Sequence, residues 1–416
     1  TANYDYYFHC NNVSPLSIHD CNIHDIFMHC KSGAITYKAF LFYFTNIDIN
    51  FINNQVTKCV VEPKILACDS DSNNQLKMHS NNVKNCYHRE GTKNKIEVVS
   101  SSYHINDIKD NTIIFENTDL SGRGFYVKYN RGCKFISNFI QNANYFDDSG
   151  ALYITDLGSG DDFEIENCSF INCYGNSKHY GSIIAIKNID YDFVIKNTTF
   201  DTSENEYNYE TGVVWDRKKH FEGYLIKLEY TSKFNPEQVK FYGCIFNKLK
   251  SNGHNSGGIG LFLTQNKQYN VVFEYCKYEH ITFTNEKYGG GAISFTNEGD
   301  ESKKSLTIKN CQFNDISSKL GGGAIFFNTN SQEFYIENTK FEQTKTVYDN
   351  QNGGTIFIQL QNDQIPVSIK NCQFVETSSE NGGAIYIQGN PNSQKNVLID
   401  NCSFTKTCAK TDGNAI

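Results

Sequence analysis

The sequence is poor in residues that interrupt strands or adapt a core, with 5 Pro, 2 Met and 1 Trp among 416 residues. No apolar run reaches the 18 residues that predict a membrane-spanning helix. The formal net charge is 38 − 46 = −8, without a basic block, which argues against nucleic acid and anionic membrane surfaces as partners. Nucleophile elbows, P-loops and dinucleotide fingerprints are also missing, so we expect no catalytic residue, metal or cofactor.

What the chain has instead is a repeat. A Gly-Gly-(Ala/Thr)-Ile unit begins at residues 290, 322, 353 and 382, at intervals of 32, 31 and 29 residues. Each copy is followed by an Asn-Cys/Thr-x-Phe unit, beginning at Asn310, Asn338, Asn371 and Asn401. A fixed period of this length is typical of a stacked repeat array rather than of a domain with one central core.

One repeat contains three short alternating runs separated by turn residues, with no helical periodicity. The alternation slips by one residue near Asn401-Cys402, which predicts a corner, with Cys402 and Phe404 pointing inward. We therefore predict an all-β, right-handed parallel β-helix of about 30 residues per coil. Its interior would be filled by columns drawn from 31 Phe and 26 Tyr residues.

The organisation along the chain is uneven. We expect residues 1–90 to form an irregular Cys/His-rich N-terminal cap and degenerate first coils. His and Cys residues are frequent among the first thirty positions, but their spacing matches no known zinc site. Residues 91–416 carry the repeats, with an insertion at about 216–238 where Gly212 and Gly258 lie 46 residues apart. Because the last residues stop within a repeat, we expect the chain to continue beyond residue 416.

The pairing of GGA-I units with F-x-x-N units resembles the repeat of the polymorphic membrane proteins. F-x-x-N occurs literally at Phe51–Asn54, Phe135–Asn138 and Phe139–Asn142. Such repeats are found in chlamydial autotransporter passengers and in surface proteins of protists. The resemblance covers residues 91–416 well and 30–90 weakly, and it implies a secreted or surface-anchored, adhesin-like protein.

Three groups of residues are candidate structural or modified sites. A corner Asn pointing inward could hydrogen-bond the neighbouring coil and form a ladder; these positions are Asn167, Asn197, Asn310, Asn338, Asn371 and Asn401. Of the four N-x-S/T sequons, such inward corners would exclude Asn167, Asn197 and Asn401, which leaves Asn12 as the glycosylation candidate. Among the 15 cysteines, Cys168 with Cys173 and Cys402 with Cys408 are disulfide candidates, although Cys and Thr interchange along the repeat.

The insertion is the candidate interaction loop, because specific recognition usually sits on irregular loops held by a rigid scaffold. It gathers aromatic and basic residues, the types that often anchor interfaces, on an acidic chain: Trp215, Arg217, Lys218, Lys219, His220, Phe221 and Tyr224. An alternative is that Trp215 continues an inward column and that the charges are only solvated.

The preferred function is a non-enzymatic β-helix at the cell surface or outside the cell, acting in adhesion or as a structural stalk. Its partners would be a protein or glycan at a cell surface. A subunit of an extracellular filament, binding copies of itself, is the first alternative. A polysaccharide-acting enzyme is the less favoured one, since no carboxylate recurs at equivalent positions of the clear repeats.

Overall fold

The computed structural model describes most of the chain, and its described residues form 46 β-strands and no helix. The described residues are 4–11, 15–26, 38–61, 63–69, 74–88, 97–103, 105–115, 123–128, 132–145, 151–155, 163–175, 183–189, 192–201, 226–230, 238–251, 259–262, 270–283, 289–297, 304–329, 332–347, 350–360, 365–389 and 396–416. Among them there is thus no helix long and apolar enough to cross a membrane. The chain divides into two compact units: Thr1–Asn176 with Ile183–Ile189, and Ser177–Ser182 with Asp190–Ile416.

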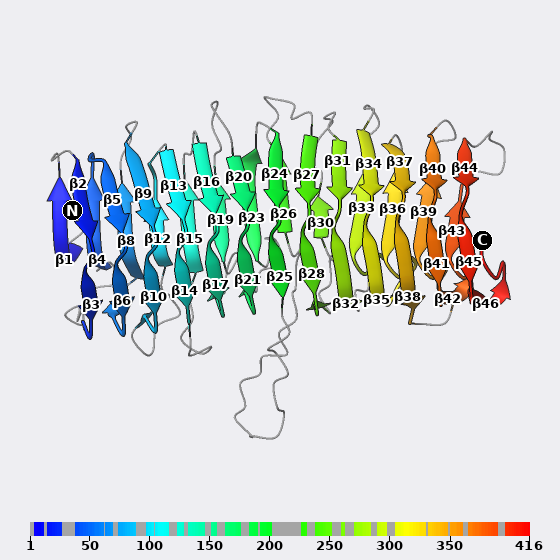
Figure 1. Ribbon diagram of the computed structural model, residues 1–416, viewed down its shortest axis with the longest axis horizontal. Coiled ribbons are helices and arrows are strands. Elements are labelled where there is room, and N and C mark those ends of the chain that lie inside the picture. Colours follow the sequence, from blue (N-terminus) through cyan, green and yellow to red (C-terminus); the bar gives the residue numbers. More distant parts are fainter. Residues whose placement is uncertain are drawn as a thin grey trace, which may run out of the picture. The chain divides into compact units, whose positions relative to one another are not determined.

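Unit 1 is a parallel β-solenoid with three main sheets (Figure 1). Sheet 1 contains β1 (Tyr4–Asn11), β4 (Lys38–Thr45), β8 (Pro63–Asp69), β12 (Glu97–Ser101), β15 (Arg123–Lys128), β19 (Leu152–Thr155) and β23 (Ile184–Ile189). Sheet 2 contains β2 (Leu16–His19), β5 (Ile49–Ile52), β9 (Gln75–His79), β13 (Ile105–Lys109), β16 (Gly132–Ile136) and β20 (Phe163–Glu166). Sheet 3 contains β3 (Asn22–His24), β6 (Gln55–Thr57), β10 (Asn82–Lys84), β14 (Thr112–Ile114), β17 (Phe139–Gln141) and β21 (Ser169–Ile171). Two short pairs join β7 (Val60–Val61) to β11 (Tyr87–His88) and β18 (Asn144–Tyr145) to β22 (Tyr174–Gly175).

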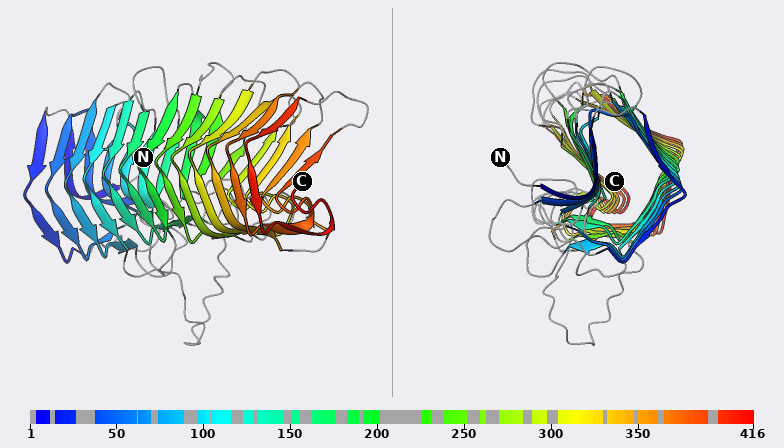
Figure 2. Two further views of the ribbon diagram at one scale, coloured as in Figure 1. Left: turned by 45° about the vertical axis from the view of Figure 1, so that its right-hand side comes forward. Right: turned by 90° about the vertical axis from the view of Figure 1, so that its left-hand side faces the viewer.

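Unit 2 repeats the arrangement. Sheet 4 contains β24 (Phe193–Lys196), β27 (Gln238–Tyr242), β31 (Asn270–Glu274), β34 (Lys304–Lys309), β37 (Gln332–Glu337), β40 (Val367–Lys370) and β44 (Val397–Asp400). Sheet 5 contains β25 (Thr199–Asp201), β28 (Ile245–Asn247), β32 (Lys277–Phe283), β35 (Gln312–Ser318), β38 (Lys340–Thr346), β41 (Gln373–Val375) and β45 (Ser403–Thr405), with β29 (Lys250–Ser251), β42 (Ser378–Asn381) and β46 (Cys408–Asp412) alongside. Sheet 6 contains β30 (Ile259–Phe262), β33 (Ile293–Asn297), β36 (Ile325–Thr329), β39 (Ile356–Leu360) and β43 (Ile385–Gln388). Within each unit, the strands of one sheet lie over one another in an end-on view (Figure 2).

The core consists of in-register columns. In sheet 5 the inward rings are Phe200, Phe246, Tyr278, Phe313, Phe341, Phe374 and Phe404, and neighbouring ring centroids lie 4.4 to 5.1 Å apart. Parallel pairing with one fixed register produces such columns because each side chain lies on its equivalent one strand away. Burial of each ring contributes about 1.5–3 kcal/mol, so the columns are the main source of stability. The parallel β-helix predicted from the repeat is thereby confirmed, with equivalent strands roughly 30 residues apart.

The Gly pairs form a turn that only glycine fits. Gly322 has φ +73°, and a Cβ there would lie 2.1 Å from the carbonyl oxygen of Ile325. A Cβ on Gly323 would lie 2.1 Å from the carbonyl oxygen of Gly354 in the next coil. The first glycine therefore supplies the left-handed backbone, and the second allows two coils to approach closely.

Residues 1–90 were expected to form an irregular cap and degenerate first coils. In their described part, strands pair in register with the following coils, and Ile18, Phe51 and Met78 occupy one column. This part of the chain lacks the Gly pairs of the later coils. Of the expected insertion, only β26 (Ile226–Tyr230) and residue 238 are described.

Candidate functional site

The Asn residues that precede Cys or Thr in the repeat lie at the corner between two sheets. All six corner residues, from Asn167 to Asn401, have a left-handed φ between 46° and 53°. Their side chains are exposed, apart from the half-buried Asn310. The inward orientation expected for them is therefore corrected: a left-handed residue breaks the alternation of the strand, so the Asn turns outward and the next residue turns inward.

Three of the sequons lie at these outward-facing corners. Asn167, Asn197 and Asn401 are exposed, so orientation does not prevent them from carrying a glycan. The hydrogen bond from Nδ2 of Asn401 to Oδ1 of Asn371, at 2.7 Å, runs along the outside of the corner. Asn12 lies outside the described residues.

An inward Asn ladder does exist, one residue further along, in unit 1. Its members are Asn54, Asn81, Asn111 and Asn138, all at most 1% exposed. Oδ1 of Asn81 accepts the backbone N–H and the Nδ2 of Asn54, at 2.9 and 3.1 Å, and the same pattern links Asn81 to Asn111 and Asn111 to Asn138. The second Nδ2 hydrogen of Asn54 goes to the carbonyl oxygen of Ile18 in the preceding coil. Each buried amide is thus hydrogen-bonded on both sides.

The literal F-x-x-N units explain part of this ladder. Phe51 and Phe135 point inward, a left-handed residue follows two positions later, and Asn54 and Asn138 then enter the core. Asn81 and Asn111 follow Met78 and Ile108 instead of Phe, so the motif alone does not find them.

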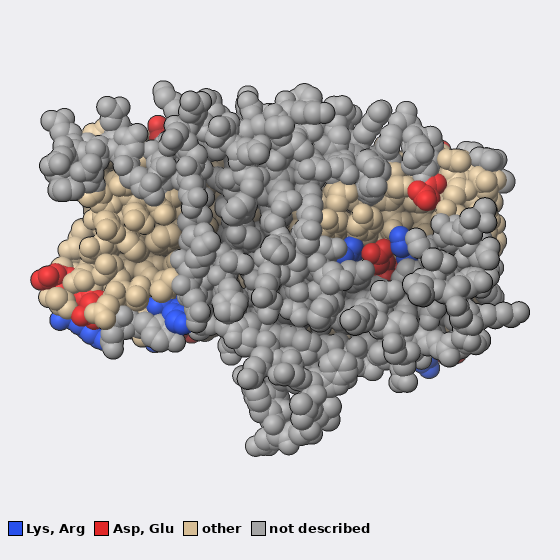
Figure 3. Space-filling model, turned by 180° about the vertical axis from the view of Figure 1, so that it is seen from behind, with Lys and Arg blue, Asp and Glu red and all other residues tan. Residues whose placement is uncertain are grey.

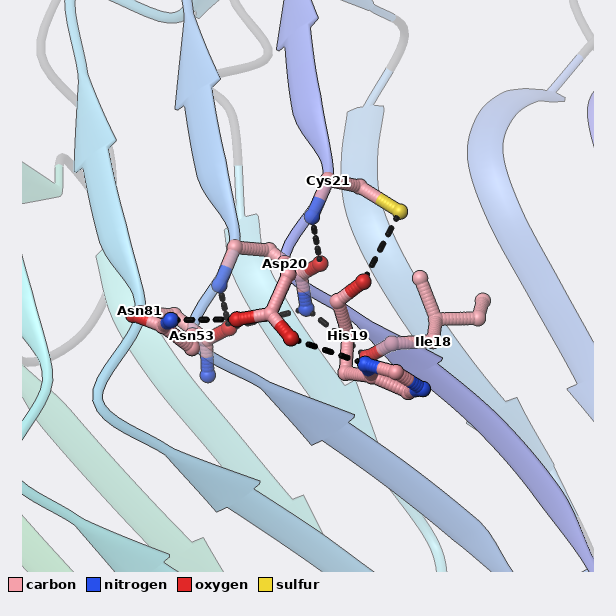
Figure 4. A network of polar contacts seen from close by, with 7 residues as sticks. Ile18, His19, Asp20, Cys21, Asn53 and Asn81 are labelled. Atoms are coloured by element: carbon pink, nitrogen blue, oxygen red, sulfur yellow. Dashed lines mark hydrogen bonds and ion pairs between the residues drawn. The ribbon is translucent and has the colours of Figure 1, made fainter.

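At the start of the ladder, the corner carries a second network of polar contacts (Figure 4). Nδ1 of His19 lies 2.9 Å from Oδ2 of Asp20, and Asn53 donates to the same carboxylate. The pKa of Asp20 is lowered, first by the hydrogen bond from His19 and then by that from Asn53. Among the described residues, no three His, Cys, Asp or Glu side chains group closely enough to hold a metal ion.

Beyond Asn138, the inward position is filled by Cys or Thr. The Sγ of Cys168 lies 3.3 and 3.2 Å from the carbonyl oxygens of Phe135 and Glu166, the two acceptors open to its single hydrogen. It also accepts the backbone N–H of Asn138 at 3.5 Å, as the amide oxygens of the ladder do for their neighbours. No disulfide joins the described cysteines, which include the disulfide candidates Cys168, Cys173, Cys402 and Cys408. Cys168 and Cys173 occupy different inward columns, and burial raises the pKa of each to about 12.

The sole buried charged pair among the described residues lies on sheet 1. Glu97 is 9% exposed and Arg123 is 1% exposed. The Glu97 carboxylate receives Nη1 of Arg123 at 3.3 Å on one oxygen and Nζ of Lys64 at 3.4 Å on the other. The Arg123 guanidinium lies 5.3 and 5.0 Å from the ring centroids of Tyr126 and Tyr153, which stack on each other. Sequence reasoning missed this cluster, because only the coil register brings its members together.

Both carboxylate oxygens of Glu97 already have a cationic partner. To bind a ligand, Glu97 would have to break its ion pairs with Lys64 and Arg123. The rings of Tyr126 and Tyr153 are already in contact with the Arg123 guanidinium. The Glu97 cluster thus forms an internal clamp across β8, β12 and β15 rather than an open catalytic site.

On the face opposite to that of Figure 1, the described surface is largely uncharged, with an acidic patch between basic ones (Figure 3).

The proposed interaction loop, Trp215 to Tyr224, lies outside the described residues. No protein-family model matches this sequence, and no curated protein resembles it at a significant level.

Proposed function

We propose that this chain is a non-enzymatic β-helix of the cell surface or extracellular space, acting as a structural stalk or in adhesion. The observation that carries the proposal is the uniformity of the columns, in which each coil of sheet 5 stacks one ring on the next at 4.4 to 5.1 Å. A stack of this kind extends by adding coils and keeps its outer surface in a regular array. Stiffness and a repeated outer surface are the properties that a stalk or adhesin needs.

The proposal is tested on the native protein in its source cells. Labelling of intact cells with a membrane-impermeant amine reagent should modify this protein, whereas a cytosolic marker in the same cells should stay unlabelled. Purified protein should then bind cells or matrix saturably and leave a polysaccharide panel uncleaved, with or without divalent cations. Protection from the label, or cation-dependent cleavage of a polysaccharide, overturns the proposal.

Within this function, the insertion is proposed to make the main lateral contact, on the support of its aromatic and basic composition. Deletion of residues 217–235 should abolish cell binding while the β-sheet circular dichroism is retained. Binding that survives the deletion assigns the contact to another surface. The second candidate function, a subunit of an assembly, is favoured by the outer face of sheet 5.

A further inference from the structure

The outer face of sheet 5 carries two columns of side chains, formed by the first and third residues of β28, β32, β35, β38, β41 and β45. The first column is exposed throughout and contains Ile245, Lys277, Gln312, Lys340, Gln373 and Ser403. The second column contains Asn247, Glu279, Asn314, Glu342, Val375 and Thr405. An inward ring such as Tyr278 or Phe341 separates the two members of each strand, so both columns face outward together. We call these twelve residues the ladder face.

The two columns differ in charge. In β32 and β38 the first column is basic and the second acidic: Lys277 with Glu279, and Lys340 with Glu342. Between them, β35 presents two amides, Gln312 and Asn314. Within the chain, Nζ of Lys340 lies 2.5 Å from Oε2 of Glu342, and the two side chains are 45% and 37% exposed. An ion pair this exposed adds little to stability, which leaves the pattern itself without a structural reason.

The pattern is complementary to itself under one symmetry operation. A two-fold axis that lies in the contact plane, parallel to the stacking direction, sets the first column of one copy against the second column of the other. Lys277 then faces Glu279 of the second copy, Lys340 faces Glu342 of the second copy, and amide faces amide at β35. Because both copies share one strand spacing of about 4.8 Å, alignment at one coil aligns the rest. A two-fold axis in the contact plane but perpendicular to the stacking direction would arrange the copies in antiparallel. It sets the first column of one copy against the first column of the other, so no Lys faces a Glu.

At two coils, the flanking corners follow the same rule. Asn310 and Asn371 lie on the corner next to the first column, and Asp315 and Glu376 lie on the corner next to the second, all with left-handed φ. The same axis sets these amides opposite these carboxylates, where an amide N–H can donate to a carboxylate oxygen. Within the chain, Asp315 also contacts His280, and Glu376 accepts hydrogen bonds from Lys406 and Gln343.

We propose that the ladder face is a docking surface for a second copy of this chain, arranged in parallel, with Lys277 and Lys340 recognising Glu279 and Glu342 of that copy. The ladder face spans six strands about 4.8 Å apart and is three residues wide, so its area is smaller than the about 800 Å² per partner of a standard interface. We therefore expect a weak dimer, and its dependence on ion pairs makes it sensitive to salt. The inference goes beyond the proposed stalk or adhesive role and does not depend on where the protein resides.

The test measures molar mass by sedimentation equilibrium over a range of protein concentrations at low and high salt. Wild type should dimerise with concentration at low salt and dissociate at high salt. Lys340→Glu sets a carboxylate against Glu342 of the second copy and should weaken the dimer by about tenfold or more. Glu342→Lys should do the same by setting two cations together.

Two further measurements separate this geometry from a general charge effect. The double variant Lys340→Glu/Glu342→Lys exchanges the columns within the strand and should restore the dimer. A mixture of the two single variants should form a heterodimer, although neither forms a homodimer. Lys370→Glu, on β40 of sheet 4, is the matched control and should leave the dimer unchanged, and circular dichroism with thermal melting establishes that each variant is folded.

A wild type that stays monomeric throughout overturns the proposal. So does a dimer indifferent to Lys340→Glu, or one that the double variant fails to restore. Binding of an unlike protein or of an anionic glycan to the ladder face in place of a second copy likewise overturns it.

Discussion

The side-chain oxygen of Asn81 accepts two hydrogen bonds from Asn54 in the preceding coil, one from the backbone N–H at 2.9 Å and one from Nδ2 at 3.1 Å. The amide oxygen of Asn81 thereby accepts two donors of Asn54. The backbone N–H and Nδ2 of Asn81 donate in turn to Oδ1 of Asn111, and Nδ2 also donates to the carbonyl oxygen of Phe51. The corner of unit 1 is thus hydrogen-bonded along the stack by side chains, where the strands on either side are hydrogen-bonded by backbone.

Replacing Asn81 by Ala should destabilise the protein more than the loss of a few side-chain atoms alone would. The change leaves buried donors of Asn54 and an acceptor on Phe51 unpaired, each at a cost of about 1–3 kcal/mol. We expect the urea unfolding midpoint to fall clearly below that of Thr112→Ala, a neighbouring strand position that points outward. Equal midpoints for the two variants would show that the ladder adds nothing to stability.

The exposed corner provides a cleaner test of backbone strain. Asn371 has φ 53°, a conformation that costs an ordinary L-residue about 1–2 kcal/mol and glycine almost nothing. Asn371→Ala should therefore lower the melting temperature, while Asn371→Gly should leave it nearly unchanged. If both substitutions have the same effect, the hydrogen bond to Asn401, rather than the backbone, explains the Asn.

The sequence predicts the coil period, the parallel β-helix and the existence of a corner, because the Gly pairs and the inward Phe residues recur at a fixed spacing. It misplaces the corner by one residue. Strict alternation puts Asn401 on the inner face with Ile399, whereas its left-handed φ turns it outward and brings Cys402 in. It also fails to find the Glu97–Arg123 pair, since those residues are 26 positions apart in coils without Gly pairs. Register, which creates that contact, is a property of the stack and not of one repeat.

The Glu97–Arg123 pair should show strong coupling. Glu97→Gln removes the carboxylate beside a side chain that is 2% exposed, and loss of one partner of a buried pair costs about 3–5 kcal/mol. Arg123→Met alone should also destabilise, whereas the double variant should be more stable than the sum of the two losses predicts. A double-mutant cycle from urea unfolding measures the coupling, and additive losses would contradict the clamp.

Thiol reactivity should follow burial. The raised pKa of Cys168 and of Cys173, about 12 for both, keeps these buried thiols protonated near pH 8, where alkylation requires the thiolate. Cys408 is exposed and should be alkylated in the native protein. Peptide mass spectrometry after native labelling should find Cys408 modified and Cys168 and Cys173 modified only after denaturation. A Cys168–Cys173 or Cys402–Cys408 disulfide in the same peptides would restore the pairing expected from the sequence.

The column of rings in sheet 5 contains one tyrosine, Tyr278, among its phenylalanines. Tyr278 is fully buried between Phe246 and Phe313, with centroids 4.8 and 4.4 Å away, and its hydroxyl has no hydrogen-bond partner among the described residues. Burial raises the pKa of Tyr278 well above its usual value, so the group stays neutral and only its unpaired hydroxyl matters. Removing a buried, unsatisfied polar atom should gain about 1–3 kcal/mol.

Tyr278→Phe should therefore raise the melting temperature, which is uncommon for a change in a packed core. Phe313→Tyr in the adjacent coil is the matched control, because it adds a hydroxyl to an equally buried ring and should lower the melting temperature. If Tyr278→Phe destabilises the protein as much as the control does, the hydroxyl of Tyr278 has a partner, and the column is not uniformly apolar.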